Sequence, residues 1–248
     1  MAYIFTVSPD FGPEHLAGWY VFNTWLQRVL EVPIHLELYR DFSDQRQAIA
    51  DGQVDLIYAN PYDASMLIRE KAFIPLVRPR GKSDETIIAV STECDIASVE
   101  ELTPGIRIAT TDDPDVHMMG MIMLEPSNLT MENVTLNICD TYVVVAKELL
   151  RGSSNVGIFL AEAFEDLSSV VKGGLKILVR SDIQVVHHSL LMGPELAEYG
   201  VRLKNALLRM SKDAKGHGVL VSLGFEGWEE VDREAMEFMI DLIDTLLV

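Results

Sequence analysis

The stretch Gly-Gln-Val-Asp-Leu-Ile-Tyr-Ala-Asn-Pro-Tyr, residues 52–62, decides the fold of this chain. Asp51 and Gly52 end one helix, because glycine readily adopts the backbone conformation that closes a helix. Residues 54–58 form an apolar run that is typical of a buried strand. Asn60 and Pro61 then start another helix, since asparagine caps helices and proline fits the first helical turn. A helix end, a strand and a helix start in so short a stretch indicate an α/β fold.

The same alternation extends outward from this stretch in both directions. Ser43 is a residue type that caps helices, and it predicts the start of the helix that Gly52 ends. The predicted strands are residues 2–7, 34–39, 54–58 and 73–77, and the predicted helices are residues 13–30, 43–50 and 60–70. These elements make two successive strand–helix–strand units, so the sheet has parallel strands covered by helices.

After residue 85 the pattern restarts. Strands are predicted at 86–90, 106–110, 134–138, 156–160, 175–179 and 184–188, and helices at 98–102, 116–124, 142–150, 195–210, 215–223 and 233–247. The last helix carries an apolar stripe of Met236, Met239, Ile240, Ile243 and Leu247. We expect two α/β lobes, each a mixed, mostly parallel sheet flanked by helices. Residues 1–85 and 184–248 form one lobe, residues 86–183 form an inserted second lobe, and two crossing strands form the hinge.

Charge excludes some classes of partner. The 248 residues contain 20 Lys and Arg against 38 Asp and Glu, which gives a formal net charge of −18. Such a chain repels phosphate backbones and anionic membrane surfaces, so we expect neither nucleic-acid binding nor membrane insertion. The first residues lack the basic segment and cleavage site of a signal peptide. We therefore expect either a cytoplasmic protein or the mature part of an exported one.

Four motifs in order resemble those of type II periplasmic solute-binding proteins, in particular the phosphate, phosphite and phosphonate-binding family of ABC transporters. They are residues 52–62, residues 98–109, the Asp113-Pro114 pair followed by Gly120, and residues 218–225. The resemblance implies a two-lobed protein that closes on a small molecule and serves an ABC permease or a sensor protein. It implies no cofactor, and we expect a monomer or a homodimer.

The sequence departs from this family at three anion contacts. Residues 115–119 stand where the family has the Ser-Thr-Ser that binds an oxyanion at a helix N-terminus. Asp140, Thr141 and Tyr142 replace a Ser-His pair, and Phe42 after Asp41 replaces a tyrosine. We therefore expect the fold of the family without its phosphonate ligand.

Ligands of open α/β sheets bind at the carboxyl ends of the strands, so the residues that follow the predicted strands are the candidate site. They are Ser8, Asp10, Phe11, Asp41, Phe42, Asn60, Tyr62, Thr110, Asp113, His117, Met118, Thr141 and Tyr142. This set is rich in aromatic rings, hydroxyls and carboxylates and holds no Lys or Arg, which favours a neutral, cationic or aromatic ligand. In the alternative interpretation, Asp41 and Asp113 only cap helices and Tyr62 is a core ring.

Catalytic and metal motifs are absent, so we expect no catalytic residue and no metal. Residues 117–123 combine His with four Met, which suits Cu(I), but these Met do not share one helical face and fit a core better. His187 and His188 lie on a predicted strand and point to opposite faces, so we interpret them as structural. We expect Cys94 and Cys139 to be buried free thiols.

Two other functions stay open at this point. One is a cytoplasmic enzyme on the same fold, similar to the menaquinone-pathway enzymes that act on chorismate-derived substrates, with His117 near Asp113 or Asp140 as a proton-transfer pair. The other is a ligand-free regulatory domain, in which side chains such as Phe42 and Met118 fill the cleft.

Overall fold

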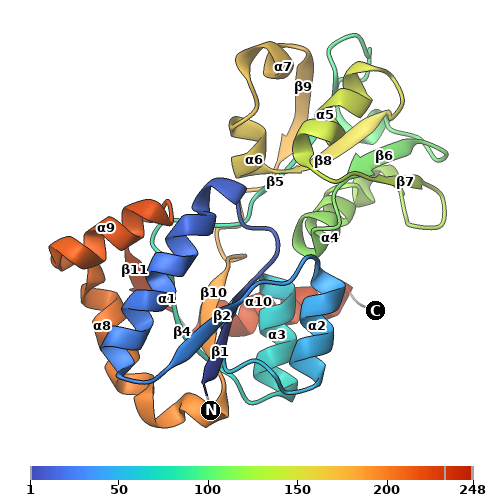
Figure 1. Ribbon diagram of the computed structural model, residues 1–248. Helices are drawn as coiled ribbons and strands as arrows, with labels where there is room; N and C mark the ends of the chain where they lie inside the picture. Colours follow the sequence, from blue (N-terminus) through green and yellow to red (C-terminus); the bar gives the residue numbers. More distant parts are fainter. Residues whose placement is uncertain (1, 232, 247–248) are drawn as a thin grey trace. The chain divides into compact units, whose positions relative to one another are not determined.

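A computed structural model describes residues 2–231 and 233–246 of the chain (Figure 1). The chain divides into two compact units. The first contains the residues up to Lys82 together with His187–Asp244, and the second consists mainly of Ser83–Val186. Each unit has its own sheet and its own core, and both sheets are mixed.

The sheet of the first unit has the strand order β11-β4-β10-β3-β1-β2. Its strands are β1 (Tyr3–Val7), β2 (Ile34–Glu37), β3 (Leu56–Ala59), β4 (Ile74–Pro79), β10 (Ser189–Met192) and β11 (Trp228–Glu230). Pairing is parallel where β1 lies between β2 and β3, with Phe5 opposite both Leu36 and Leu56. Strand β10 runs antiparallel to β3 and β4, so the late part of the chain closes the sheet.

Helices cover this sheet on both faces. They are α1 (Leu16–Leu30), α2 (Phe42–Ala50), α3 (Pro61–Glu70), α8 (Gly200–Arg209), α9 (Ala214–Ser222) and α10 (Arg233–Leu246), with short 3-10 turns at Pro13–His15, Pro194–Tyr199 and Met210–Lys212. Phe5 is fully buried in the core that α1, α8 and α9 make with the sheet. Thr6 points to the opposite face, as alternation along a strand requires, and its hydroxyl accepts a hydrogen bond from Gln45 of α2.

The second unit repeats the plan with the strand order β7-β6-β8-β5-β9. Its strands are β5 (Thr86–Ser91), β6 (Arg107–Thr110), β7 (Thr135–Ile138), β8 (Val156–Leu160) and β9 (Leu175–Arg180). Its helices are α4 (Pro114–Met123), α5 (Tyr142–Leu150), α6 (Ala161–Glu165) and α7 (Ser169–Gly173), with 3-10 turns at Val99–Glu101 and Glu125–Ser127. Apolar clusters lie on both faces of the sheet, one against α4 and one against α5 and α6.

Two segments without helix or strand, residues 80–85 and 181–188, carry the chain between the units. One backbone hydrogen bond joins them, from the Asp84 amide to the Val186 carbonyl at 2.8 Å. The buried Glu85 carboxylate accepts the amides of Ile183 and Gln184, at 3.2 and 2.8 Å, and the Ser181 hydroxyl. The second crossing is thus tied to the first by one carboxylate.

The structure corrects several sequence predictions. The strand expected at 184–188 begins only at Ser189, because the backbone donors before it bind Glu85 and Gln184 has a positive φ of 60°. The cap of α2 is Asp41, whose carboxylate accepts the Asp44 amide, and not Ser43. Strand β11 and helices α6 and α7 were not predicted. Parallel pairs lie in β2-β1-β3 and β7-β6-β8, and the remaining pairs of each sheet are antiparallel.

Several smaller expectations can also be compared with the structure. Met236, Met239, Ile240 and Ile243 of the predicted stripe are buried, and Leu247 lies outside the described residues. Cys94 and Cys139 are free thiols, but only Cys139 is buried. Among the described residues, no helix has the length and apolar character that crossing a membrane requires.

Candidate functional site

In the first unit, the carboxyl ends of β1 and β3 bring Ser8 and Asn60 together. The Asn60 side-chain amide donates to the Ser8 hydroxyl at 3.0 Å and to an Asp63 carboxylate oxygen at 2.9 Å. Asn60 also caps α3, because its carbonyl oxygen accepts the Asp63 amide at 2.7 Å. All three side chains are buried. The cap of α3 therefore also fixes the loop after β1.

Arg46 extends this group of buried side chains toward the surface. Its Nε lies 2.6 Å from Asp63 Oδ1, and its guanidinium lies 4.6 Å from the centre of the Tyr62 ring and 5.4 Å from that of Phe42. Burial raises the pKa of Asp63, and the hydrogen bonds and charge of Arg46 and the bond from Asn60 offset only part of that rise. Arg46 is not among the residues listed from the sequence, yet it lies one helical turn after Phe42 and contacts two of those residues, Phe42 and Tyr62.

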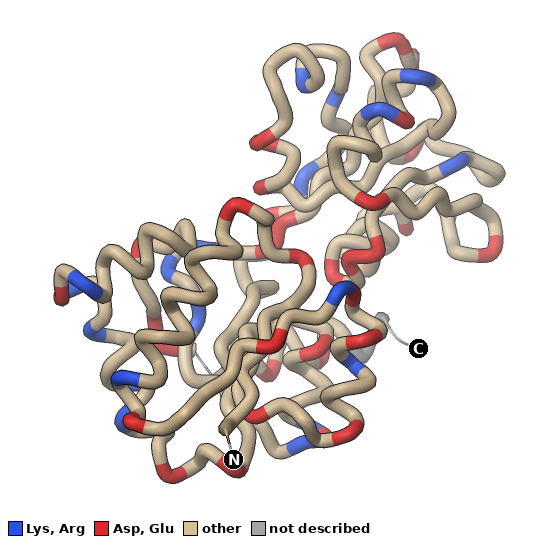
Figure 2. Tube along the Cα trace, in the orientation of Figure 1, with Lys and Arg blue, Asp and Glu red and all other residues tan. Residues whose placement is uncertain are grey.

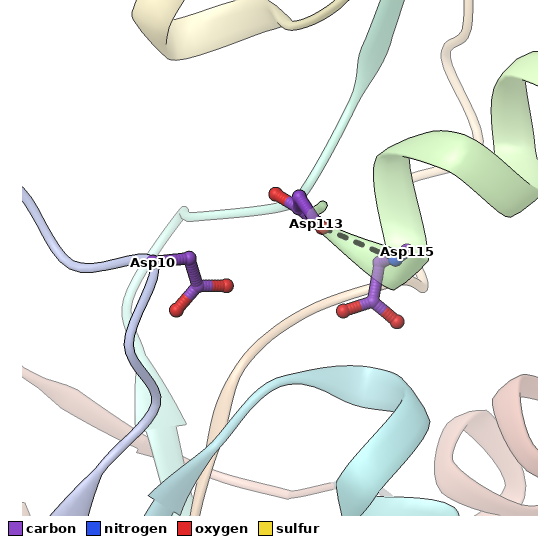
Figure 3. A group of neighbouring side chains, drawn as sticks. All are labelled: Asp10, Asp113 and Asp115. Carbon is purple, nitrogen blue, oxygen red and sulfur yellow. Dashed lines mark hydrogen bonds between the residues drawn. The ribbon is translucent and has the colours of Figure 1, made fainter. Parts of the chain in front are cut away.

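Asp10 forms a second, half-buried pair in the same unit. Its Oδ2 lies 3.0 Å from Nε2 of His188, and the imidazole stacks on Tyr58 with 5.2 Å between ring centres. Burial alone would raise the pKa of Asp10, but the charge and hydrogen bond of His188 and the bond from Ser8 hold that pKa below its usual value. Asp10 is drawn in Figure 3, on the loop that follows β1.

Two predicted residues of the first unit lie apart from these pairs. Phe11 packs against the core of the unit. Asp41 caps α2 and accepts hydrogen bonds from the Arg40 side chain at 3.0 and 3.1 Å. The alternative interpretation of Asp41 as a cap is therefore confirmed.

In the second unit, Asp113 organises the start of α4. Its Oδ1 accepts the backbone amides of Asp115 and Val116, at 3.1 and 3.2 Å, and its Oδ2 accepts the Tyr142 hydroxyl at 3.1 Å. Figure 3 shows Asp113 and Asp115 at this helix end, with the first of these bonds dashed. Both carboxylates are buried, at 5% and 3% exposure. Asp113 caps its helix, as the alternative interpretation held, and it also positions a tyrosine from α5.

The other predicted residues of this unit surround that helix end or begin the next helix. Thr110 ends β6 and is fully buried, and its hydroxyl has no hydrogen-bond partner within the described part of the chain. Thr141 caps α5 by accepting the Val144 amide. His117 and Met118 are half-buried on α4. Burial lowers the pKa of His117, so its imidazole is neutral at pH 7.

The geometry gives the proton-transfer pair of the enzyme alternative no support. His117 and Asp113 are joined by a helical backbone bond of 3.1 Å. Hydrogen bonds join the Asp113 side chain to the amides of Asp115 and Val116 and to the Tyr142 hydroxyl.

Sequence reasoning missed Arg46 and Asp63, and it interpreted His188 as structural without its pairing with Asp10. The spacing of Asp63 three residues after Asn60 could have been noticed, because a side chain at that position of the first turn reaches back to the cap. Arg46 shares a helical face with Phe42. Nothing in the sequence pairs His188 with Asp10, because that pairing needs β10 to insert beside β3.

Comparison with known proteins agrees with this architecture. A family model described as "ABC transporter, phosphonate, periplasmic substrate-binding protein" matches residues 5–236. XAC2383 from Xanthomonas citri, solved with chloride bound, is 15% identical, with a TM-score of 0.84 over 99% of this chain and 98% of that one. No curated protein matches the sequence.

Two further solved structures are similar. PhnD1 from Prochlorococcus marinus in complex with methylphosphonate is 11% identical, with a TM-score of 0.82 over 99% of this chain and 98% of that one. The periplasmic aliphatic sulphonate binding protein SsuA from Escherichia coli is 14% identical, with a TM-score of 0.68 over 99% of this chain and 86% of that one. At these identities the similarity establishes the fold alone.

Proposed function

This chain belongs to the phosphonate-type family of periplasmic substrate-binding proteins of ABC transporters, and we propose that its own ligand carries a cationic or hydrogen-bond-donating group instead of a phosphonate. The first turn of α4 carries this proposal. The buried carboxylate of Asp115 stands where the family resemblance implies hydroxyl donors, and it lies two residues after the buried cap Asp113, which the resemblance includes.

An oxyanion at a helix N-terminus needs free amides and no competing negative charge. Here Asp113 already accepts two of the α4 amides. Asp115 adds a second carboxylate in the same first turn. Val116 and Met119 are buried, so they turn toward the interior. His117 is neutral at pH 7, so it does not compensate the two carboxylates.

The first unit supports the same ligand class. Arg46, the cation that lies near Phe42 and Tyr62 in this unit, is already bound to the fully buried Asp63. Asp10 keeps its negative charge at neutral pH, because His188 and Ser8 hold its pKa low. The carboxylates and aromatic rings at these strand ends suit an amine or another polar donor with an apolar body.

We further propose that binding closes the two units about the crossing segments, as in other hinge-bending binding proteins. The crossings are suited to this motion because residues 80–85 and 181–188 lie outside the helices and strands of both units. A permease of the ABC class is then the partner that receives the ligand.

Thermal unfolding in the presence of matched small molecules tests the proposal. Each molecule is offered in an anionic and a cationic form, such as methylphosphonate against methylammonium and ethanesulfonate against ethylammonium, with arginine and choline as larger cations. A true ligand at one hundred times its Kd stabilises the protein by about 2.7 kcal/mol, and its removal reverses the effect. Small-angle scattering on the same samples measures closure.

The expected result is stabilisation and compaction by a cationic or neutral compound and none by methylphosphonate or sulfonates. Asp113→Asn, which removes one negative charge at α4 while keeping a capping side chain, weakens that response. Stabilisation by methylphosphonate that Asp113→Asn leaves unchanged would contradict the proposed ligand class and leave the family assignment intact.

A further inference from the structure

A hollow lies within the first unit, between α1 and α9, and it is lined by none of the candidate-site residues. It has a volume of about 350 Å³. Its lining residues are Val21, Thr24, Trp25 and Arg28 of α1 and Lys215, Gly218 and Val219 of α9. On each helix these positions are three or four residues apart, so each helix presents one continuous stripe to the groove. We call this feature the α1–α9 groove.

The two helices make contact at one end and separate at the other. At the closed end, a Cβ atom on Gly18 would lie 2.3 Å from the Ser222 carbonyl oxygen, and His15 Nδ1 lies 3.3 Å from the same oxygen. At the open end, a Cβ atom on Gly218 would meet no atom within 4 Å. The groove therefore widens from Gly18 toward Gly218, and a glycine at its wide end keeps it open.

The walls of the groove are apolar. Trp25 is half-buried and Val219 is buried, whereas Val21 is 48% exposed on the rim. Trp25 and the two valines, Val21 and Val219, give the lining an apolar surface, which suits an aromatic or branched body. The volume falls at the lower end of the range of small-molecule sites.

The charges at the open end are both positive. Arg28 and Lys215 are exposed, and neither forms an ion pair within residues 2–231 and 233–246. Lys215 belongs to a stretch rich in cations, because residues 200–218 contain five Lys or Arg and a single Asp. Two of these five, Arg202 and Lys204, form ion pairs with Glu31 and Glu230. Figure 2 shows these cations along α8 and α9. The single acid, Asp213, is engaged as the cap of α9.

We propose that the α1–α9 groove binds a small organic anion, consisting of an aromatic or branched apolar body and a carboxylate or sulfonate group. The body lies on Trp25 between the valines, and the anionic group lies at the open end between Arg28 and Lys215. This site takes the opposite charge from the ligand proposed for α4, and it is independent of that proposal. An anion bound here neutralises two exposed cations that have no partner of their own.

Three naphthalene derivatives of the same size serve as probes: 2-naphthoate, 2-naphthylmethanol and 2-naphthylmethylammonium. Their binding is measured by calorimetry at low and at high salt. We expect 2-naphthoate to bind at least tenfold more tightly than the cation, with the neutral alcohol between them. High salt weakens naphthoate binding, because the two cations are exposed.

Two variants place the binding in the groove. Gly218→Leu fills the open end without strain, because its Cβ has free space and leucine is a better helix former than glycine. Lys215→Glu reverses one charge. We expect Gly218→Leu to abolish naphthoate binding and Lys215→Glu to weaken it at least fivefold. Gly173→Leu, at the end of α7 with equally open space, and Lys147→Glu, at an exposed position of α5, are the matched controls and leave binding unchanged.

Failure of 2-naphthoate to bind overturns the proposal. Equal binding of the three probes overturns the assignment of the anion to Arg28 and Lys215. Naphthoate binding that survives both Gly218→Leu and Lys215→Glu places the site elsewhere and likewise overturns it. Circular dichroism confirms that each variant is folded, and Lys215→Glu, a surface substitution, keeps the test valid even if the leucine variant unfolds.

Discussion

Arg46 is the one cation that binds the buried Asp63 carboxylate within the described part of the chain. Replacing Arg46 with methionine removes that cation. The two side chains are joined at 2.6 Å through Nε and at 3.4 Å through Nη2. Methionine keeps an apolar stem beside Phe42 and Tyr62, so the substitution tests the charge more than the packed volume. We expect Arg46→Met to be less stable than the parent protein at neutral pH.

The size of the loss follows from the exposure of the two partners. Asp63 is 0% exposed and Arg46 is 34% exposed. Removing one member of a fully buried pair costs about 3–5 kcal/mol. Because a third of the Arg46 side chain is exposed to water, the attraction here is weaker, and we expect a loss of about 2 kcal/mol in the free energy of unfolding. In a chain of this size that corresponds to a decrease of about 4–8 °C in Tm.

The loss also depends on pH, with a definite sign. Burial already holds the pKa of Asp63 above its usual value in the folded protein. Without Arg46 this folded pKa rises further, whereas the unfolded chain titrates near its ordinary value of about 3.9. The folded variant then binds a proton that the unfolded chain has released, so stability falls as pH rises toward the folded pKa. The deficit of Arg46→Met is therefore smaller near pH 5 than near pH 7.5.

Urea unfolding of four proteins measures these effects: the parent, Arg46→Met, Asp63→Asn and the double variant. We expect a coupling energy of at least about 1 kcal/mol, because the second substitution removes the charge that the first one leaves unpaired. Arg40→Met is the matched control, since Arg40 is 83% exposed in its pair with Asp41 and contributes almost nothing. Equal deficits at both pH values together with additive substitutions would refute the reasoning.

Three further outcomes are expected from single substitutions. Asp113→Ala removes the α4 cap and the acceptor of the Tyr142 hydroxyl, so calorimetry should show a loss of about 1.5–3 kcal/mol in the free energy of unfolding. This loss should exceed that of Tyr142→Phe, and equal losses would contradict the assigned role of the cap. Burial lowers the folded pKa of His117, so below about pH 6.5 the unfolded chain takes up a proton that the folded protein does not, and stability falls. His117→Gln should make this fall smaller, and parallel pH profiles of stability for the parent and the variant would exclude this contribution. Gly18→Ala should lower the free energy of unfolding in urea by about 1–3 kcal/mol, since its Cβ would lie 2.3 Å from the Ser222 carbonyl oxygen. An unchanged urea midpoint would mean that α9 moves freely to make room for the methyl group.

Local sequence signals predicted most of the elements. The Asn60-Pro61 start of α3 and the apolar strand before it were visible because a cap and a strand depend on neighbouring residues. Asp41 and Asp113 were recognised as possible caps for the same reason. The site itself depends on contacts between segments that are far apart in the sequence, and local sequence signals do not predict such contacts. His188 reaches Asp10 only because β10 inserts antiparallel beside β3, and Arg46 reaches Asp63 only because α2 and α3 pack side by side.

The position of β10 has a consequence for the order in which the chain folds. Strand β10 lies between β3 and β4, yet it is synthesised after the entire second unit, so β3 and β4 have no shared neighbour until Met192 has left the ribosome. The second unit is nearly continuous in sequence and can complete its sheet earlier. Its contacts are more local, which favours faster folding. During synthesis the first unit therefore exposes unpaired strand edges for the longest time, and aggregation of a nascent or truncated chain would begin there.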